Sequence, residues 1–348
     1  MKFKHHILYG ICVQLMLISC NAKDESESGT PEFPEEYLAE ISILGDDLIL
    51  PVITDMVVND TTIIALGLLD DYWIHQYEKN TGKCIGRHIK RGQGPEDIVG
   101  CESFYNTGNG WKIYDYMTRH VKVFSSDFTS SSLSENDSIP NNEYEGARFA
   151  GLSFKNGGKK LFTMMKSKDT DIKNGVMLAD DNGIGAIHFE TPVDDDNNKL
   201  KYFRWYNIEL SPNGKNLVAT SNPACYMAIY DVQGNEMTLK SYQCFFPLTI
   251  SDPEDSAKVF NENKTAFTAL AVTDSRIITC MADNPEEEGN TDIMVWDWNG
   301  KPLRRYKTDK IILTMELSPN EKDMIYAFAI DKERNSYLVK IRCQNLLK

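Results

Sequence analysis

Two similar segments decide the fold: IELSPNGKNLVAT at residues 208–220, and MELSPNEKDMIYAF at residues 315–328. Each reads as a short apolar strand, a Ser-Pro-Asn turn, a polar gap and a second apolar strand. Proline fixes φ for the turn, and Asn or Gly tolerates the left-handed position that a tight turn often needs. A motif that occurs twice in this form predicts a chain built from repeats.

The same frame occurs four more times with weaker similarity. The copies are MVVNDTTIIALG from residue 56, ESFYNTGNGWKIYD from 102, LSFKNGGKKLFTM from 152 and LAVTDSRIITCM from 270. The six starts lie 45 to 62 residues apart, a period typical of four-stranded propeller blades with loop insertions. Apolar hairpins such as IMVWDWNGKPL follow several repeats, and long amphipathic helical patterns are absent. We therefore expect an all-β fold, a six-bladed β-propeller of four-stranded antiparallel blades.

The ends of the chain are expected to close the ring. The last repeat has only three strand patterns before Lys348. The apolar run LAEISILGDDLILPV, residues 38–52, precedes the first repeat and could supply the fourth strand. Pairing the two ends in one sheet would cover an edge that could otherwise template aggregation.

The first residues indicate export rather than folding. MKFKHH is basic and ILYGICVQLMLIS is weakly polar to apolar, so residues 1–19 are predicted to be a signal peptide. Leu17-Ile18-Ser19-Cys20 resembles a bacterial lipobox, in which Cys20 is acylated after cleavage; an ordinary signal peptide with a chance cysteine is the alternative. Several acyl chains make a stable membrane anchor. Residues 20–37 are acidic and proline-bearing, which predicts a flexible tether before a propeller at residues 38–348.

The tether also bears on location. Asn21 follows the cysteine in place of the aspartate associated with inner-membrane retention, and Lys23-Asp24-Glu25 resembles the export signal of surface lipoproteins in Bacteroidetes. We expect an outer-membrane lipoprotein, surface-exposed or facing the periplasm, that meets the membrane through its lipid anchor only. We also expect a monomer. The net charge of −14 excludes a nucleic-acid partner, because no basic patch is present to release counterions.

The remaining cysteines do not predict a metal site. None sits in a CxxC pair, and most are interpreted as buried free thiols, although a cross-strand bridge between Cys225 and Cys244 is an alternative. The six are Cys84, Cys101, Cys225, Cys244, Cys280 and Cys343.

The lipobox, the acidic tether, the segment GQGPED at residues 92–97 and the repeated LSPNGK-type turns together resemble the TolB-like six-bladed propeller lipoproteins of Bacteroidetes. Members of that family often carry Gly-x-Gly-Pro-Gly-Glu-Phe between the first two blades. Gly92, Gly94, Pro95 and Glu96 match this segment, whereas Asp97 departs from it. The resemblance covers essentially the whole mature chain. It implies the fold and specifies no reaction, because these motifs serve turns and packing.

Read alone, KRGQGPEDIVG at residues 90–100 suggests a phosphate-binding loop. Neither GxxxxGK[ST] nor GxGxxG before a helix is matched, and Glu96 and Asp97 would repel a phosphate. We interpret the segment as a connection between blades, with glycines for tight turns and a stiffening proline.

Two carboxylates are candidates for the central channel. Glu209 and Glu316 occupy the same place in the inner strands of two repeats, and inner strands line the channel of a propeller. They could bind a polar ligand or calcium, as in six-bladed lactonases, or they could be solvated or paired with arginine. Two carboxylates make a poor calcium cage, so we expect no cofactor, with calcium as the alternative.

Four further residues are predicted to reach one mouth of the channel. Arg148 and Arg204 each precede a repeat start by four residues and are each followed by an aromatic residue. With Trp205 and Tyr206 they could grip an anionic or carbohydrate-like ligand by bidentate hydrogen bonds and stacking. Pairing of both arginines with acidic neighbours is the alternative.

We expect a binding or scaffold module for a protein partner or small ligand at the cell envelope. The alternative is a metal-dependent hydrolase or lactonase with its site in the central channel. HExxH and GxSxG are absent, and the sequence assigns no catalytic residue, so a module is favoured over an enzyme. The histidines beyond the signal peptide are scattered over different repeats, at His75, His88, His120 and His188.

Overall fold

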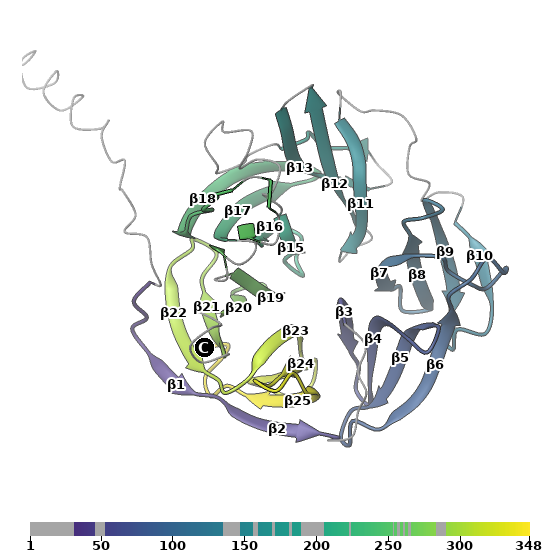
Figure 1. Ribbon diagram of the computed structural model, residues 1–348, viewed down its shortest axis with the longest axis horizontal. Helices are drawn as coiled ribbons and strands as arrows, with labels where there is room; N and C mark the ends of the chain where they lie inside the picture. The colour runs from purple at the N-terminus through teal and green to yellow at the C-terminus, as the bar shows by residue number, and fades with distance from the viewer. Residues whose placement is uncertain are drawn as a thin grey trace, which may run out of the picture.

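The computed structural model places six sheets radially around one axis (Figure 1). It describes residues 31–45, 53–134, 147–155, 159–168, 171–180, 183–188, 205–222, 224–252, 254–255, 258–259, 262–263, 266–282 and 290–348. Among these residues, no helix has the length and apolar character needed to cross a membrane.

Each of the six predicted repeats forms one blade, which confirms the six-bladed propeller. Blade one contains β3 (Asp55–Val58), β4 (Thr62–Leu69), β5 (Tyr72–Glu78) and β6 (Cys84–Lys90). Blade two contains β7 (Cys101–Asn106), β8 (Gly110–Asp115), β9 (His120–Ser125) and β10 (Ser131–Leu133). Blade three contains β11 (Ala147–Lys155), β12 (Lys159–Lys168), β13 (Asp171–Asp180) and β14 (Gly183–Ile184). Blade four contains β15 (Trp205–Leu210), β16 (Asn216–Ser221), β17 (Cys225–Gln233) and β18 (Glu236–Phe246).

Blades five and six include strands from the start of the chain. Blade five contains β19 (Ala266–Val272), β20 (Ile277–Ala282), β21 (Thr291–Trp296), β22 (Pro302–Lys307) and, as a fifth strand, β1 (Glu36–Leu38). Blade six contains β23 (Ile311–Leu317), β24 (Met324–Ile330), β25 (Ser336–Arg342) and β2 (Glu40–Leu44). The antiparallel pairing of β2 with β25 confirms the expected closure of the ring.

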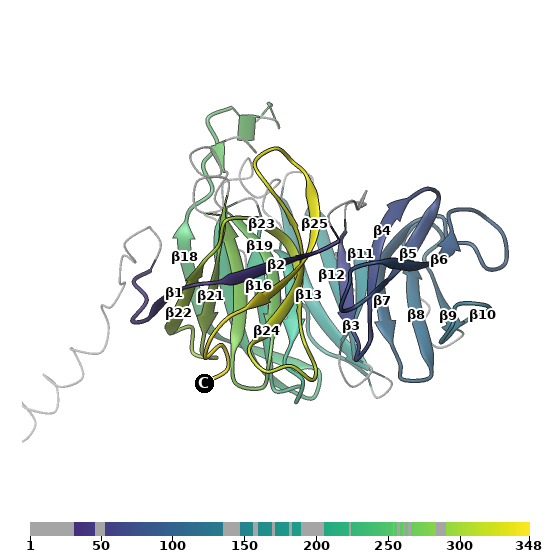
Figure 2. The same ribbon diagram turned by 90° about the horizontal axis from the view of Figure 1, so that it is seen from below.

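The fifth strand of blade five was not expected. β1 pairs in parallel with β22, so the segment runs along the outside of two neighbouring blades (Figure 2). Glu35 forms an ion pair with Arg304 at 2.9 Å, and the Tyr37 ring stacks on Tyr306. The Phe33 ring packs edge-on against Trp296, with 5.1 Å between ring centroids. Residues 33–37, which the sequence analysis assigned to the tether, therefore pack against blade five.

A buried ion pair joins the first and last blades. Lys79, the residue after β5, has a side chain 4% exposed, and its ammonium lies 2.9 Å from the Glu321 carboxylate in the β23–β24 turn. Lys340 and the Tyr326 hydroxyl donate to the same carboxylate. Burial opposes ionisation of Glu321, but these donors hold its pKa at about 2, so the ion pair persists at neutral pH.

Five of the six inner strands contain a β-bulge near their beginning. In blades two, four, five and six the residue before the bulge is apolar and packs between blades, and the next paired residue returns to the channel wall. The register shifts lie between Cys101 and Ser103, Phe149 and Gly151, Trp205 and Asn207, Phe267 and Ala269, and Ile312 and Thr314. The repeat starts at residues 102 and 208 align Ser103 with Glu209. The bulged register instead places Tyr105 at the position of Glu209 in blade two.

The hydrophobic core consists of six clusters, each between two neighbouring blades. The six cysteines that lie within the described residues are free thiols, four of them buried. Cys244 lies opposite Tyr226 because a bulge shifts the register, so the alternative bridge between Cys225 and Cys244 is not formed.

The closing strand offers a matched test of the ring. Ile41 packs against the core between blades five and six, whereas Ile43 is 45% exposed. We expect Ile41→Thr to lower the Tm by roughly 3–8 °C, because it buries a hydroxyl and loses apolar area, and Ile43→Thr to change it by less than about 1 °C. Removal of residues 38–50 should lower the Tm by about 10 °C or more. Differential scanning calorimetry measures all three, and an unchanged Tm in the truncated chain would contradict closure by β2.

Candidate functional site

The central channel is bounded by the inner strands β3, β7, β11, β15, β19 and β23 (Figure 1). Two cavities of about 500 and 550 Å³ open along it, one lined by the ends of these strands and the other by their beginnings. These volumes lie within the range of small-molecule sites. Four charged side chains line both cavities and so mark the level at which the cavities meet: Asp55, Lys155, Glu209 and Glu316.

One ion pair crosses this level of the channel. The Lys155 ammonium lies 2.7 Å from the Glu209 carboxylate, with side chains 11% and 36% exposed. It joins blades three and four, because Lys155 ends β11 and Glu209 lies in β15. The sequence analysis offered an arginine as a possible partner of the channel carboxylates; the partner of Glu209 is a lysine.

The other two carboxylates carry raised pKa values. Burial raises the pKa of Asp55 to about 7; the Lys155 ammonium opposes this shift and the Glu209 carboxylate adds to it. Burial raises the pKa of Glu316 to about 8, with a further contribution from the Glu209 carboxylate. Each accepts a hydrogen bond from the backbone N–H of the next residue, Met56 at 2.8 Å and Leu317 at 3.1 Å. These hydrogen bonds do not offset the cost of burying the two carboxylates or the added repulsion from Glu209.

Glu209 and Glu316 were the two residues that the sequence offered as calcium ligands. Among the described residues, no three His, Cys, Asp or Glu side chains are placed to hold a metal ion. Calcium takes six to eight oxygen ligands, whereas Lys155 places an ammonium beside Glu209. The arrangement suits a cationic organic group better than a dehydrated metal ion, because hydrogen bonds to separate carboxylates need no closed cage of ligands.

The predicted rim is only partly described. Arg204 lies outside the described residues, and for Arg148 and Tyr206 the structure describes the backbone in β11 and β15 alone. Trp205 is 8% exposed and packs in the core between blades three and four, so its assignment as a stacking platform is wrong. The bulge after Trp205 is the cause, because it turns this side chain away from the channel.

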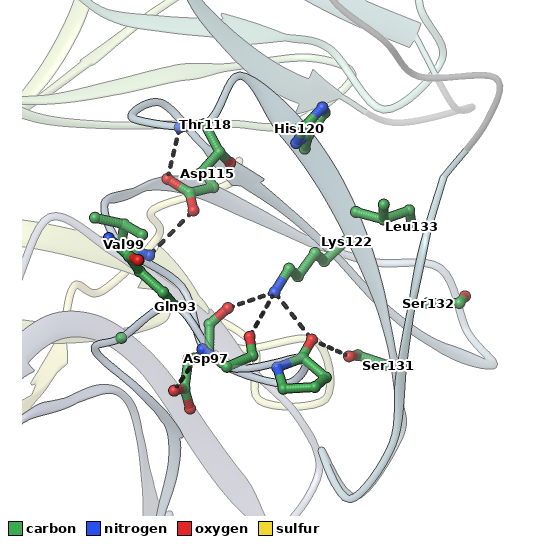
Figure 3. Close-up of a pocket in the computed structure, with 13 residues that line it drawn as sticks. Gln93, Asp97, Val99, Asp115, Thr118, His120, Lys122, Ser131, Ser132 and Leu133 are labelled. Carbon is green, nitrogen blue, oxygen red and sulfur yellow. Dashed lines mark hydrogen bonds between the residues drawn. The ribbon is translucent and has the colours of Figure 1, made fainter.

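The connection at residues 92–97 lies between β6 and β7, as interpreted from the sequence, and lines a separate surface cavity of about 550 Å³. Figure 3 shows the Lys122 side chain of β9 directed at this loop. Its ammonium donates to the backbone carbonyls of Gly94 at 3.4 Å, Pro95 at 2.9 Å and Asp97 at 2.5 Å. A loop that turns three carbonyls towards one ammonium presents the wrong polarity for phosphate.

The two glycines of this loop have a packing role. A Cβ at Gly94 would lie 2.7 Å from the Asp97 carboxylate, and one at Gly92 would approach the same oxygen more closely. Asp97 accepts a hydrogen bond from the Gly94 N–H at 3.0 Å, which fixes the turn. Asp115 holds the following residues by accepting from the N–H groups of Val99 and Gly100.

Sequence reasoning found Glu209 and Glu316 but missed Asp55 and Lys155. Strand residues alternate between the two faces, so positions two before and two after a channel residue also face the channel. Asp55 lies two residues before Val57, and Lys155 lies two residues after Ser153, the positions aligned with Glu209. Comparison of only one position per repeat therefore missed them, although the alternation could have found both.

Comparisons with known proteins agree with this architecture. A protein from Bacteroides fragilis NCTC 9343 described as exported aligns with a TM-score of 0.50 at 13% identity, over 91% of this chain and 98% of its own. The calcium-binding protein regucalcin from Agrobacterium tumefaciens strain C58 aligns with a TM-score of 0.54 at 10% identity, over 89% and 97%. A luciferin-regenerating enzyme aligns with a TM-score of 0.52 at 10% identity, over 88% and 96%. At these identities the likeness shows the fold alone.

No curated protein matches the sequence. One family model does match it, over residues 32–320, and that span includes strands of all six blades. Its description, TolB-like 6-blade propeller-like, agrees with the sheet order and with the expectation drawn from the lipobox and turn motifs. The chain therefore belongs to the TolB-like six-bladed propeller family.

Proposed function

We propose that this chain is a lipid-anchored binding module of the cell envelope whose central channel takes a small ligand. The observation that carries the proposal is the meeting of Asp55, Lys155, Glu209 and Glu316 between two ligand-sized cavities. Burying three carboxylates beside one ammonium costs folding free energy, and a ligand that completes their interactions offsets that cost. A protein partner on a propeller face remains compatible with a ligand in the channel.

Anchoring through Cys20 follows from the signal peptide and lipobox. A protein described as exported shares this fold, which is compatible with the same location. The tether needs to reach only as far as Phe33, which packs against Trp296 of blade five. The thirteen residues that separate Cys20 from Phe33 span at most about 45 Å when extended, so the anchor would hold the propeller close to the outer membrane.

A metal-dependent hydrolase or lactonase is the alternative. The carboxylates Glu209 and Glu316 are its only support in this chain, because the likeness to regucalcin extends to the fold alone. Elemental analysis of the purified protein decides between the two. One equivalent of calcium or zinc that disappears in a Glu209→Gln, Glu316→Gln double variant would favour the enzyme over the module.

Anchoring is tested by Cys20→Ala. We expect this variant to lose labelling by radioactive palmitate and to leave the membrane fraction, since the acylated residue is gone. Cys84→Ala, which removes a half-buried thiol of β6, is the matched control and should stay in the membrane fraction. Retention of Cys20→Ala in membranes would contradict the lipid anchor.

The cost of the channel charge is tested by Glu316→Gln. The folded protein binds the Glu316 proton more tightly than the unfolded chain, whose carboxyl has the ordinary pKa of 4.5. Below that pH both states are protonated and the substitution changes little. As the pH rises towards 8, the ionised carboxylate increasingly destabilises the wild-type fold.

We therefore expect Glu316→Gln to raise the Tm at pH 8, by about 2–4 °C for each kcal/mol of repulsion removed, and to have little effect at pH 4. Glu236→Gln, at an exposed carboxylate of β18, should leave the Tm unchanged at both pH values. Thermal melts followed by circular dichroism measure the difference. A Tm for Glu316→Gln that falls below wild type at pH 8 would contradict a destabilising charge.

Binding itself is tested on protein purified from its own cells. We expect native mass spectrometry to show an adduct of small-molecule mass that is released on denaturation and lost in an Asp55→Asn, Glu316→Gln double variant. Pull-down from intact cells with mass spectrometry of co-purifying proteins tests for a protein partner in parallel. An unliganded protein with a partner captured equally by the double variant would overturn the channel as the binding site.

A further inference from the structure

The channel has more acidic than basic side chains. Asp55, Glu209 and Glu316 contribute three carboxylates at the level where the two cavities meet, and Lys155 is the one ammonium that lines both. Lys155 is engaged with Glu209 at 2.7 Å. The remaining two carboxylates each accept one hydrogen bond from a neighbouring backbone N–H, so the second oxygen of each has no hydrogen-bond donor among the described residues. A positively charged group is the complement that this arrangement needs.

The cavity on one side of the carboxylates is lined by neutral polar groups. It has a volume of about 550 Å³ and lies at the beginnings of the inner strands. The Asn207 amide lines it, and its Nδ2 is buried without a hydrogen-bond partner among the described residues. A buried amide that donates to no acceptor destabilises the fold, and a ligand oxygen that accepts from it would offset that cost. The hydroxyl-bearing residues of the same wall are Thr54, Ser103, Ser153, Thr163 and Thr314.

An aromatic ring borders the same cavity. Tyr116 is 48% exposed and follows β8 in the turn that Asp115 fixes by accepting from the N–H of Met117. An exposed tyrosine beside hydroxyl and amide groups presents an apolar face next to polar partners, the combination that suits a ring with both C–H and O–H groups.

We propose that the channel binds a small polyhydroxylated primary amine in its protonated form, an amino sugar being the simplest example. The ammonium would lie between Asp55 and Glu316, and the hydroxyl oxygens would face Asn207. This inference rests on the proposed function and adds the chemical class of the ligand.

The proposal has a consequence for proton exchange. Asp55 faces Lys155 and Glu209, and Glu316 faces Glu209, Asp55 and Lys155, and both carboxyls titrate near neutral pH. A bound ammonium favours the ionised carboxylates, so binding at pH 7 releases protons from the protein. Acidification to pH 5.5 weakens binding, because protonated carboxyls then face the ammonium.

Isothermal titration calorimetry of the full mature protein at pH 7 tests the class of ligand. The probes are D-glucosamine, N-acetyl-D-glucosamine and D-glucose, which share a ring but differ in charge. We expect D-glucosamine to bind at least tenfold more tightly than the other two. Repeating the titration in buffers with different ionisation enthalpies should show proton release with D-glucosamine.

Variants locate the two ends of the ligand. Asp55→Asn with Glu316→Gln should weaken D-glucosamine binding at least tenfold and abolish proton release. Asn207→Ala should weaken binding roughly three- to tenfold, as expected for one neutral hydrogen bond, and should retain proton release. Glu236→Gln is the control on an exposed carboxylate, and melting curves establish that each variant is folded.

Equal binding of D-glucosamine and N-acetyl-D-glucosamine, or unchanged binding in the double variant, would overturn the proposal. The adduct identified by mass spectrometry of protein from its own cells separates this failure from that of the proposed function. A neutral or anionic molecule in the channel would overturn the amine and leave the binding module standing. The absence of any adduct, together with no binding of the three probes, would overturn both.

Discussion

The rest of the structure depends on the pairing of the two ends of the chain. β2 from the N-terminal segment completes blade six against β25, and the Lys79–Glu321 ion pair joins blade six to blade one. A propeller is stabilised by contacts between neighbouring blades, so an open ring would expose one of the six core clusters to water. Closure therefore maintains every blade interface and also the spacing of the inner strands around the channel.

That spacing brings the channel charges together. Asp55, Lys155 and Glu316 come from blades one, three and six, and no two of them are close in sequence. The bulges of the inner strands let an apolar residue enter the core just before polar residues return to the channel wall. The fold tolerates neighbouring carboxylates at its axis because the packing of the six blade interfaces offsets the free energy that their burial costs.

The sequence predicted the parts of this structure that local chemistry determines. Turn residues and strand alternation located all six inner strands, and the missing strand of the last repeat led to β2. Two results required three-dimensional information. The Trp205 side chain was assigned to the rim because a bulge is not visible in the residue pattern. Glu36 and Tyr37 of β1 were assigned to the tether because this segment has no apolar strand pattern; it is held by parallel pairing with β22 and by the ion pairs of Glu35 and Glu36.

The positions of β1 and β2 in the chain also determine when the ring can close. These strands are synthesised first, yet their partners β22 and β25 end at Lys307 and Arg342, near the end of the chain. Blade six cannot be completed until β25 has been synthesised, so β2 has no partner while blades one to five are being made. Any translocation step that the chain undergoes before β25 is available would therefore act on an open ring.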